Sequence, residues 1–251
     1  MLQSIDRAMR VLDLLKEHHF GLGVTELSHR LGVAKSTVHR IVSSLEAHGY
    51  VKQEPGNGNY RLGLKFLEMQ QYVLKQMEIT SIARPFLDEL SREANEIVHL
   101  VEQQDYEVVY LDKVEQHSNT IRIYSRVGRR APMHCTGVGK VLLSHFSEAK
   151  LEQYFQQVPN RQKYTDYTVT TEKEIKHAIT RIKGAGYSID NEEHERGIRC
   201  VAAPVYNHVG EVNYGVSVTG PLDRMDDNKV KHVVELLTNS CHQISKELGH
   251  H

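Results

Sequence analysis

The chain has 251 residues, of which 39% are hydrophobic and 25% charged, with a formal net charge of −1. This length fits one large or two modest domains, and the composition is typical of a soluble globular protein. No apolar run approaches the roughly 20 residues of a membrane-spanning helix, the charged first residues lack the apolar centre of a secretion signal, and the 3 cysteines cannot all pair. We therefore expect a cytoplasmic protein with reduced thiols and no membrane partner.

Residues 1–62 predict three helices followed by a β-hairpin. The first helical pattern begins near Ser4, which is a candidate N-cap. A short second helix ends at Gly32, where a left-handed turn is expected, and a third helix covers residues 34–48. Two short extended runs then flank a Pro-Gly-Asn-Gly turn. This order of elements is typical of a winged helix-turn-helix domain.

The free face of the third helix suits contact with double-stranded DNA. It carries hydroxyls and cations near the helix start, where phosphates and base edges can be met. The alternative is an interaction domain with a solvated polar face, because residues 1–62 carry only a small excess of cations. The order of elements favours DNA binding. The candidate DNA-binding residues are Lys35, Ser36, Thr37, His39, Arg40 and Ser43 on the helix, with Lys52 and Arg61 on the hairpin.

Residues 63–78 predict a linker helix, and residues 79–251 predict a second domain. The helical pattern continues beyond the linker and is expected to break near Pro85. Strands in consecutive runs with helices between them imply a largely antiparallel sheet in an α+β domain. The expected strands cover 97–103, 107–114, 120–127, 186–193, 198–207 and 212–220, and the expected helices cover about 137–146, 148–156, 171–185 and a closing stretch from Asp226.

The stretch RRAPMHCTGVGKVLL, residues 129–143, resembles a phosphate-binding loop but lacks its spacing. A P-loop lysine is followed by Ser or Thr, whereas Val141 stands here, and His134 takes the position of the first glycine. The pattern instead predicts a helix start capped by Thr136, where free backbone N–H groups favour an anion. An ordinary capped helix without a ligand is the alternative.

Three segments of the second domain could converge on one polar pocket: 134–140, 190–200 and 215–220. Two hydroxyl side chains of the last segment share a strand face, since side chains alternate along a strand. The pocket would offer hydroxyls, N–H groups, one carboxylate and one thiol, which suits a small polar acid or sugar acid. Its expected lining is Asp190, Cys200, Ser217, Thr219 and the helix start.

Catalysis and metal binding are the rival interpretations of these segments. A cysteine nucleophile needs a base within hydrogen-bond reach, and no base is clearly paired with Cys135 or Cys200. Zinc ligands usually show C-x2-C or H-x3-H spacing, which is missing here, and HERGI lacks the second histidine of H-E-x-x-H. We therefore predict no catalytic residue, no cofactor and no metal site. The alternative is an enzyme that converts a small acid and carries a fused helical domain.

The residues resemble those of the IclR (isocitrate lyase regulator) family of bacterial transcription factors over nearly the whole chain. In the first domain the resemblance rests on SIDRAMRVLDLL, TELSHRLGVAKSTVHRIVSSLEAHGYV and YRLGLKFLEM, and in the second on GRRAPMHCTGVGKVLL, YSIDNEEHERGIRCVAAPVYN and GVSVTGP. It implies a multidomain chain: an all-α-type winged helix-turn-helix domain with a β wing, a linker helix, and an α+β effector domain with a curved antiparallel sheet related to GAF domains. It also implies homodimers, often paired as homotetramers, on operator DNA.

The resemblance further implies that a small carboxylate, sugar acid or aromatic acid modulates DNA binding. HCTG is similar to the sequence of members that sense sugar acids such as 2-keto-3-deoxygluconate, and some members bind zinc in this pocket. We therefore expect a transcriptional regulator, and specifically a repressor, that responds to a small carboxylate or sugar acid. The family's effector contacts fall on Gly137, Val138, Asp190, Cys200, Ser217 and Thr219, with Ile123 and Ala131 as apolar lining, and Thr219 replaces a serine often seen.

Overall fold

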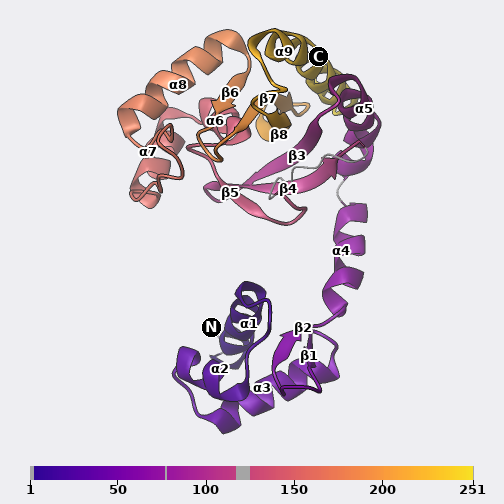
Figure 1. Ribbon diagram of the computed structural model, residues 1–251, viewed down its shortest axis with the longest axis vertical. Coiled ribbons are helices and arrows are strands. Elements are labelled where there is room, and N and C mark those ends of the chain that lie inside the picture. Colours follow the sequence, from indigo (N-terminus) through magenta and orange to yellow (C-terminus); the bar gives the residue numbers. More distant parts are fainter. Residues whose placement is uncertain (1–2, 77, 117–124, 251) are drawn as a thin grey trace. The chain divides into compact units, whose positions relative to one another are not determined.

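The computed structural model describes residues 3–76, 78–116 and 125–250, and the chain divides into two compact units, Met1–Gln76 and Met77–His251 (Figure 1). Within the described residues, no helix is both long enough and apolar enough to cross a membrane. The expected strand over 120–127 falls largely outside the described residues, and so does the predicted pocket residue Ile123.

The first unit has the predicted order of three helices and a hairpin, followed by a further helix. The second helix ends at Gly32, whose φ of 66° is left-handed and whose N–H donates to the carbonyl of His29, as the glycine predicts. The apolar faces of the three helices enclose one small core with the hairpin. The elements are α1 (Gln3–Glu17), α2 (Val24–Leu31), α3 (Lys35–Ala47), β1 (Val51–Gln53), β2 (Tyr60–Leu62) and α4 (Lys65–Gln76).

The start of the first helix differs from the prediction. Because α1 already includes Gln3, Ser4 lies inside the helix, and its prediction as the N-cap is wrong. The apolar face is buried only toward the end of α1, at Val11 and Leu15, whereas Ile5 remains 54% exposed. The helix therefore contacts the core of its own unit through its second half.

In its described residues, the second unit is a six-stranded antiparallel sheet with helices on both faces. The strand order is β5-β4-β3-β8-β7-β6, and every neighbouring pair is antiparallel, as predicted. The elements are α5 (Glu78–Ala94), β3 (Ile97–Gln104), β4 (Glu107–Val114), β5 (Arg130–Pro132), α6 (Gly137–Ser144), α7 (Glu148–Gln157), α8 (Glu172–Ala185), β6 (Ser188–Asn191), β7 (Ile198–Tyr206), β8 (Val212–Pro221) and α9 (Asp227–Glu247).

Two apolar layers hold the sheet between its helices. Helices α5 and α9 pack on one face, and α6, α7 and α8 lie over the other (Figure 1). The predicted helix break near Pro85 is wrong, since α5 continues through this residue. Burial of Ala83, Leu87 and Leu90 against the sheet offsets the roughly 3 kcal/mol that an interior proline costs a helix.

Candidate functional site

The polar face of α3 remains outside the core of the first unit. Val38 and Val42 are fully buried on the opposite face of the helix. Side chains that reach away from this buried face are available to a partner. Of the candidate DNA-binding residues, Lys35, Ser36, His39, Arg40, Ser43, Lys52 and Arg61 are exposed, and Thr37 is half-buried.

Two arginines line a groove between α1 and α3. The groove has a volume of about 470 Å³, and Arg7 and Arg40 lie on its two walls together with Thr37. On the hairpin, by contrast, Arg61 forms an ion pair with Glu54 at 3.0 Å. A guanidinium already paired with a carboxylate gives up that partner when it binds a phosphate, so Arg61 is the weaker candidate for contact with a polyanion.

In the second unit, strand pairing brings polar residues from four strands onto one face of the sheet. His99 on β3 pairs with Ser217 on β8, Thr219 on β8 pairs with Cys200 on β7, and Cys200 pairs with Asp190 on β6. Directly opposed residues of an antiparallel pair point to the same face. The apolar residues that alternate with them point toward α5 and α9 instead.

The start of α6 covers this polar face and encloses a cavity of about 30 Å³, which is room for roughly one water molecule. Thr136 caps the helix by accepting a hydrogen bond from the Gly139 N–H at 3.2 Å, as predicted. A small acid would therefore enter only if neighbouring side chains moved apart. The lining residues are His99, Tyr110, Thr136, Gly137, Val138, Asp190, His194, Glu195, Ile198, Cys200, Ser217 and Thr219.

The structure brings most of the predicted pocket residues together around this cavity. Ala131 is an exception, because it packs in the apolar cluster beneath α6 and is absent from the cavity lining.

Sequence reasoning missed five lining residues. The sequence signal for His99 was its position as a lone polar residue in an apolar strand. Which residues His99 meets, however, depends on which strand pairs with β3. The predicted residues that line the cavity are Gly137, Val138, Asp190, Cys200, Ser217 and Thr219, together with Thr136 of the predicted helix start, and the missed ones are His99, Tyr110, His194, Glu195 and Ile198.

Asp190 is the buried carboxyl group of the cavity. It is 3% exposed, and its Oδ1 accepts a hydrogen bond from the Glu193 N–H at 2.7 Å. Burial raises the pKa of Asp190 to about 7, although the nearby charge of Lys140 opposes this shift. Near neutral pH the group therefore exists in both forms, and its protonated form can donate a hydrogen bond to an anion.

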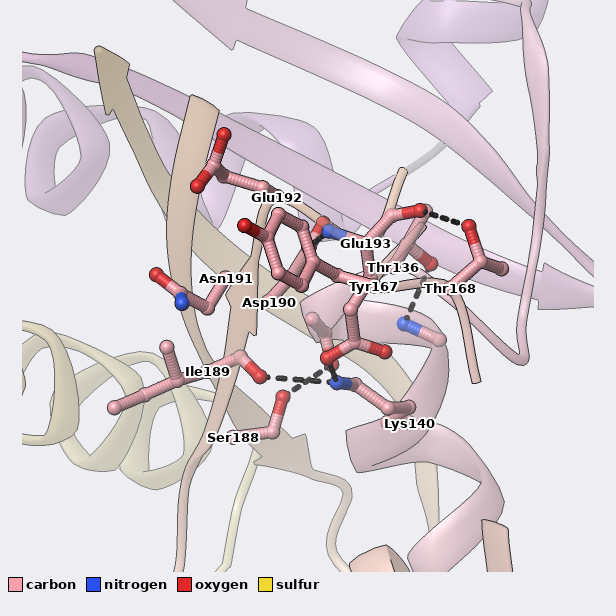
Figure 2. Close-up of polar contacts among 12 residues, drawn as sticks. Thr136, Lys140, Tyr167, Thr168, Ser188, Ile189, Asp190, Asn191, Glu192 and Glu193 are labelled. Atoms are coloured by element: carbon pink, nitrogen blue, oxygen red, sulfur yellow. Dashed lines mark hydrogen bonds and ion pairs between the residues drawn. The ribbon is translucent and has the colours of Figure 1, made fainter. Parts of the chain in front are cut away.

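The loop after β6 is fixed to α6 by a buried ion pair (Figure 2). The Lys140 Nζ donates to the Ile189 carbonyl at 2.9 Å and pairs with the Glu193 carboxylate. From the other side, the Thr168 hydroxyl donates to the Glu193 carbonyl at 2.6 Å. Both Asp190 and Glu193 are buried. Lys140 is thus engaged within the protein, in agreement with the rejection of a P-loop.

The thiols lack the features of a nucleophile. Burial raises the pKa of both the Cys135 and the Cys200 thiols, so they stay protonated at neutral pH. Cys200 Sγ accepts a hydrogen bond from the Thr219 hydroxyl at 3.1 Å, and the His134 ring bonds the Gln162 carbonyl.

Across the described ranges, no group of three or more His, Cys, Asp and Glu residues is arranged to hold a metal ion. The cavity is equipped to bind a polar molecule.

Comparisons with known proteins match both units. The model of the IclR helix-turn-helix domain matches residues 4–55, and that of the bacterial transcriptional regulator IclR C-terminal matches residues 71–246. The chain is 36% identical to the HTH-type transcriptional regulator XynR of Escherichia coli over 100% of this chain and 98% of XynR. It is 33% identical to KdgR of the same organism over 99% and 93% of the two chains.

Solved structures agree with these matches. The IclR of Thermotoga maritima superposes with a TM-score of 0.80 at 29% identity, with 100% of both chains covered. A transcriptional regulator from Alicyclobacillus acidocaldarius gives a TM-score of 0.85 at 25% identity, with 99% of this chain and 100% of that one covered. The resemblance seen in the sequence motifs is confirmed, and the chain belongs to the IclR family of bacterial transcriptional regulators.

Proposed function

We propose that this regulator is a cytoplasmic repressor that binds operator DNA through α3 and responds to a small carboxylate or sugar acid bound under the start of α6. The observation that carries the proposal is the cavity itself. A buried carboxyl with a pKa of about 7, the hydroxyls of Ser217 and Thr219 and the first residues of a helix line one cavity. Such a set of groups suits an organic acid.

On the DNA side, α3 enters a major groove, and its polar residues supply the contacts. Arg40 is the best candidate for a bidentate contact with a guanine, and Lys35 and Lys52 supply charge to the phosphates. Arg7, on the far wall of the Arg40 groove, is placed to contact the backbone. A homodimer or homotetramer presents two such helices to half-sites with a fixed spacing.

On the effector side, the carboxylate of the acid lies against the N–H groups of Gly137 and Val138. The first N–H groups of a helix have no intrahelical acceptor, and the helix dipole favours negative charge there. Protonated Asp190 donates to the same carboxylate, and the hydroxyls of Ser217 and Thr219 bind the rest of the molecule. The protein does not act as an enzyme and needs no cofactor, which accords with the raised pKa of its thiols.

DNA binding through α3 is tested by fluorescence anisotropy with DNA from upstream of the protein's own gene and with a scrambled duplex. Arg40→Ala should weaken binding to the upstream DNA by about 1–3 kcal/mol, because a bidentate base contact is lost. Binding to scrambled DNA should change little. Equal losses on both duplexes would assign Arg40 to a phosphate, and unchanged binding to both would remove it from the interface.

The effector class is tested by a thermal-shift screen of small acids, since a ligand that binds only the folded state raises the melting temperature. We expect carboxylates to stabilise the protein and amides of the same acids to have no effect. Turnover of an acid that is lost in Cys200→Ser would contradict the proposal and favour an enzyme. Expression of a reporter gene behind the operator should rise when the regulator is deleted, and a fall would show an activator.

A further inference from the structure

His99 lines the effector cavity and carries a buried hydrogen-bonding atom without a partner in the described part of the chain. The side chain lines the cavity and is 2% exposed. Its Nε2 lies 2.6 Å from the Ser125 hydroxyl, whereas its Nδ1 is buried and has no hydrogen-bond partner within the described part of the chain. Buried polar atoms are almost always paired in folded proteins, so an unpaired atom on a residue that lines a binding cavity points to a ligand.

The chemistry of the ring limits what this ligand can be. Burial, assisted by the charge of Lys113, lowers the pKa of His99 to about 3, so the ring is neutral. One ring nitrogen of a neutral imidazole donates and the other accepts, and the Ser125 hydroxyl can pair with either form. A hydroxyl group satisfies Nδ1 in both tautomers, a carboxylate satisfies it in one, and a methylene group in neither.

The position of His99 places this hydroxyl on a different part of the cavity lining from the groups that bind the carboxylate of the acid. His99 lies on β3 and Asp190 on β6, and β8 and β7 separate these strands in the sheet. The start of α6 lies near Asp190, since a Cβ on Gly137 would stand 3.6 Å from the Asp190 Cβ. The lining therefore combines anion-binding groups near β6 with a second polar group, His99, on β3.

The ring of His99 is also held in a defined orientation. The Tyr110 ring meets it edge-on, with 5.0 Å between ring centroids and 68° between planes. The Ser125 hydroxyl fixes Nε2, and Ser217 stands opposite in the strand pair. A polar atom that cannot turn away discriminates more strongly between ligands than a mobile one, because an unsuitable ligand leaves it unpaired.

We propose that His99 determines the specificity of the effector site by selecting acids that carry a hydroxyl group remote from the carboxylate. This inference rests on the proposed function, because it assumes that the cavity binds an organic acid. It narrows that class to hydroxy acids, and it gives a role to a lining residue on β3, two strands away from Asp190 on β6.

The test measures binding of matched acids to the full-length protein by calorimetry. The pairs are 3-hydroxypropanoate and propanoate, 4-hydroxybutanoate and butanoate, and gluconate and hexanoate. In the wild type, the hydroxy acid of the best-fitting pair should bind about tenfold or more tightly than its partner. In His99→Leu that ratio should fall to about one, through weaker binding of the hydroxy acid alone. His99→Gln should restore part of it, because an amide both donates and accepts.

Tyr154→Phe is the matched control, because the Tyr154 hydroxyl is also buried and without a partner in the described ranges but lies outside the cavity lining. It should keep the wild-type ratio. A second measurement needs no substitution that could unfold the protein: in ¹⁵N-histidine spectra of the wild type, the His99 Nδ1 signal should shift with the hydroxy acid and not with its partner.

The outcomes separate this inference from the proposed function. If the wild type binds hydroxy and plain acids equally, the proposed role of His99 is wrong, whereas acid binding by the cavity stands. The same conclusion follows if His99→Leu keeps the wild-type ratio of the two affinities. An Nδ1 signal that stays unchanged with a bound hydroxy acid likewise overturns the role of His99. If no acid of any pair binds the wild type, the proposed function fails, and the selection by His99 fails with it.

Discussion

The carboxyl group of Asp190 should make effector binding depend on pH. Its pKa of about 7 results mainly from burial, with Glu193 adding to the rise and Lys140 opposing it. Below this pH the group is protonated and donates to the acid, whereas above it two negative charges repel each other. Affinity for an organic acid should therefore be highest below about pH 7 and fall toward tenfold per pH unit above it.

Calorimetric titrations between about pH 5.5 and 8.5 check this dependence. Asp190→Asn should remove it, because the amide has a similar shape and no charge in this range. A pH dependence that persists in Asp190→Asn would assign the proton to another group, and Glu193 is the nearest candidate.

The ion pair between Lys140 and Glu193 should contribute to the stability of the second unit. The two side chains are only 4% and 11% exposed, so each would be a buried unpaired charge without the other. Lys140→Met should lower the free energy of unfolding in urea by about 3–5 kcal/mol. The double variant Lys140→Met/Glu193→Gln should recover much of this loss. Equal destabilisation of both variants would mean that the packing of Lys140 matters rather than its charge.

At the scale of elements, the two glycines at the start of α6 should respond differently to substitution. A Cβ on Gly139 would stand 2.4 Å from the Cα of Met133, and this backbone cannot shift easily. Gly139→Ala should therefore cost about 1–3 kcal/mol or more, measured by thermal unfolding.

Gly137→Ala is the matched variant in the same turn of α6. Its Cβ would meet the nearest atoms, in Ala202 and Ser188, at 3.5 Å, which is ordinary contact. The variant should fold with near wild-type stability and bind acids more weakly, because the methyl group narrows the cavity. If Gly137→Ala binds acids as the wild type does, the start of α6 is not part of the effector site.

The elements with local signals could be predicted from the sequence. Helical spacing predicted α2 and α3, Gly32 marked the end of α2, and the Pro-Gly-Asn-Gly turn predicted the hairpin. The break at Pro85 was predicted wrongly, because the burial of α5 against the sheet outweighs the local cost of proline. The strand β5 has only three residues, which is too short for a periodic pattern.

The cavity could be predicted only in part, because strand pairing across the whole sheet decides which residues meet there. Side-chain alternation placed Ser217 and Thr219 on one strand face, and the structure has them on the cavity side. His99 lies more than a hundred residues earlier, and only the pairing of β3 with β8 brings it to Ser217. Strand order and register depend on the whole sheet, so local sequence patterns do not contain this contact.

In the whole molecule, the proposed DNA-binding and effector-binding residues belong to different units. The effect of ligand binding at one site on affinity at the other site is a coupling free energy. This free energy is the same whichever site is occupied first. Operator DNA should therefore weaken effector binding by the same factor by which the effector weakens DNA binding. This reciprocity separates true coupling from an acid that simply competes for the DNA-binding surface.

The most direct test of the account is the affinity for upstream DNA, measured by anisotropy with and without the stabilising acid. In the wild type, saturating acid should raise the dissociation constant by about 5- to 150-fold. Asp190→Ala should bind DNA as the wild type does and show little response to the acid. If the acid binds the wild type and leaves its DNA affinity unchanged, the cavity does not control α3, and the central claim is wrong.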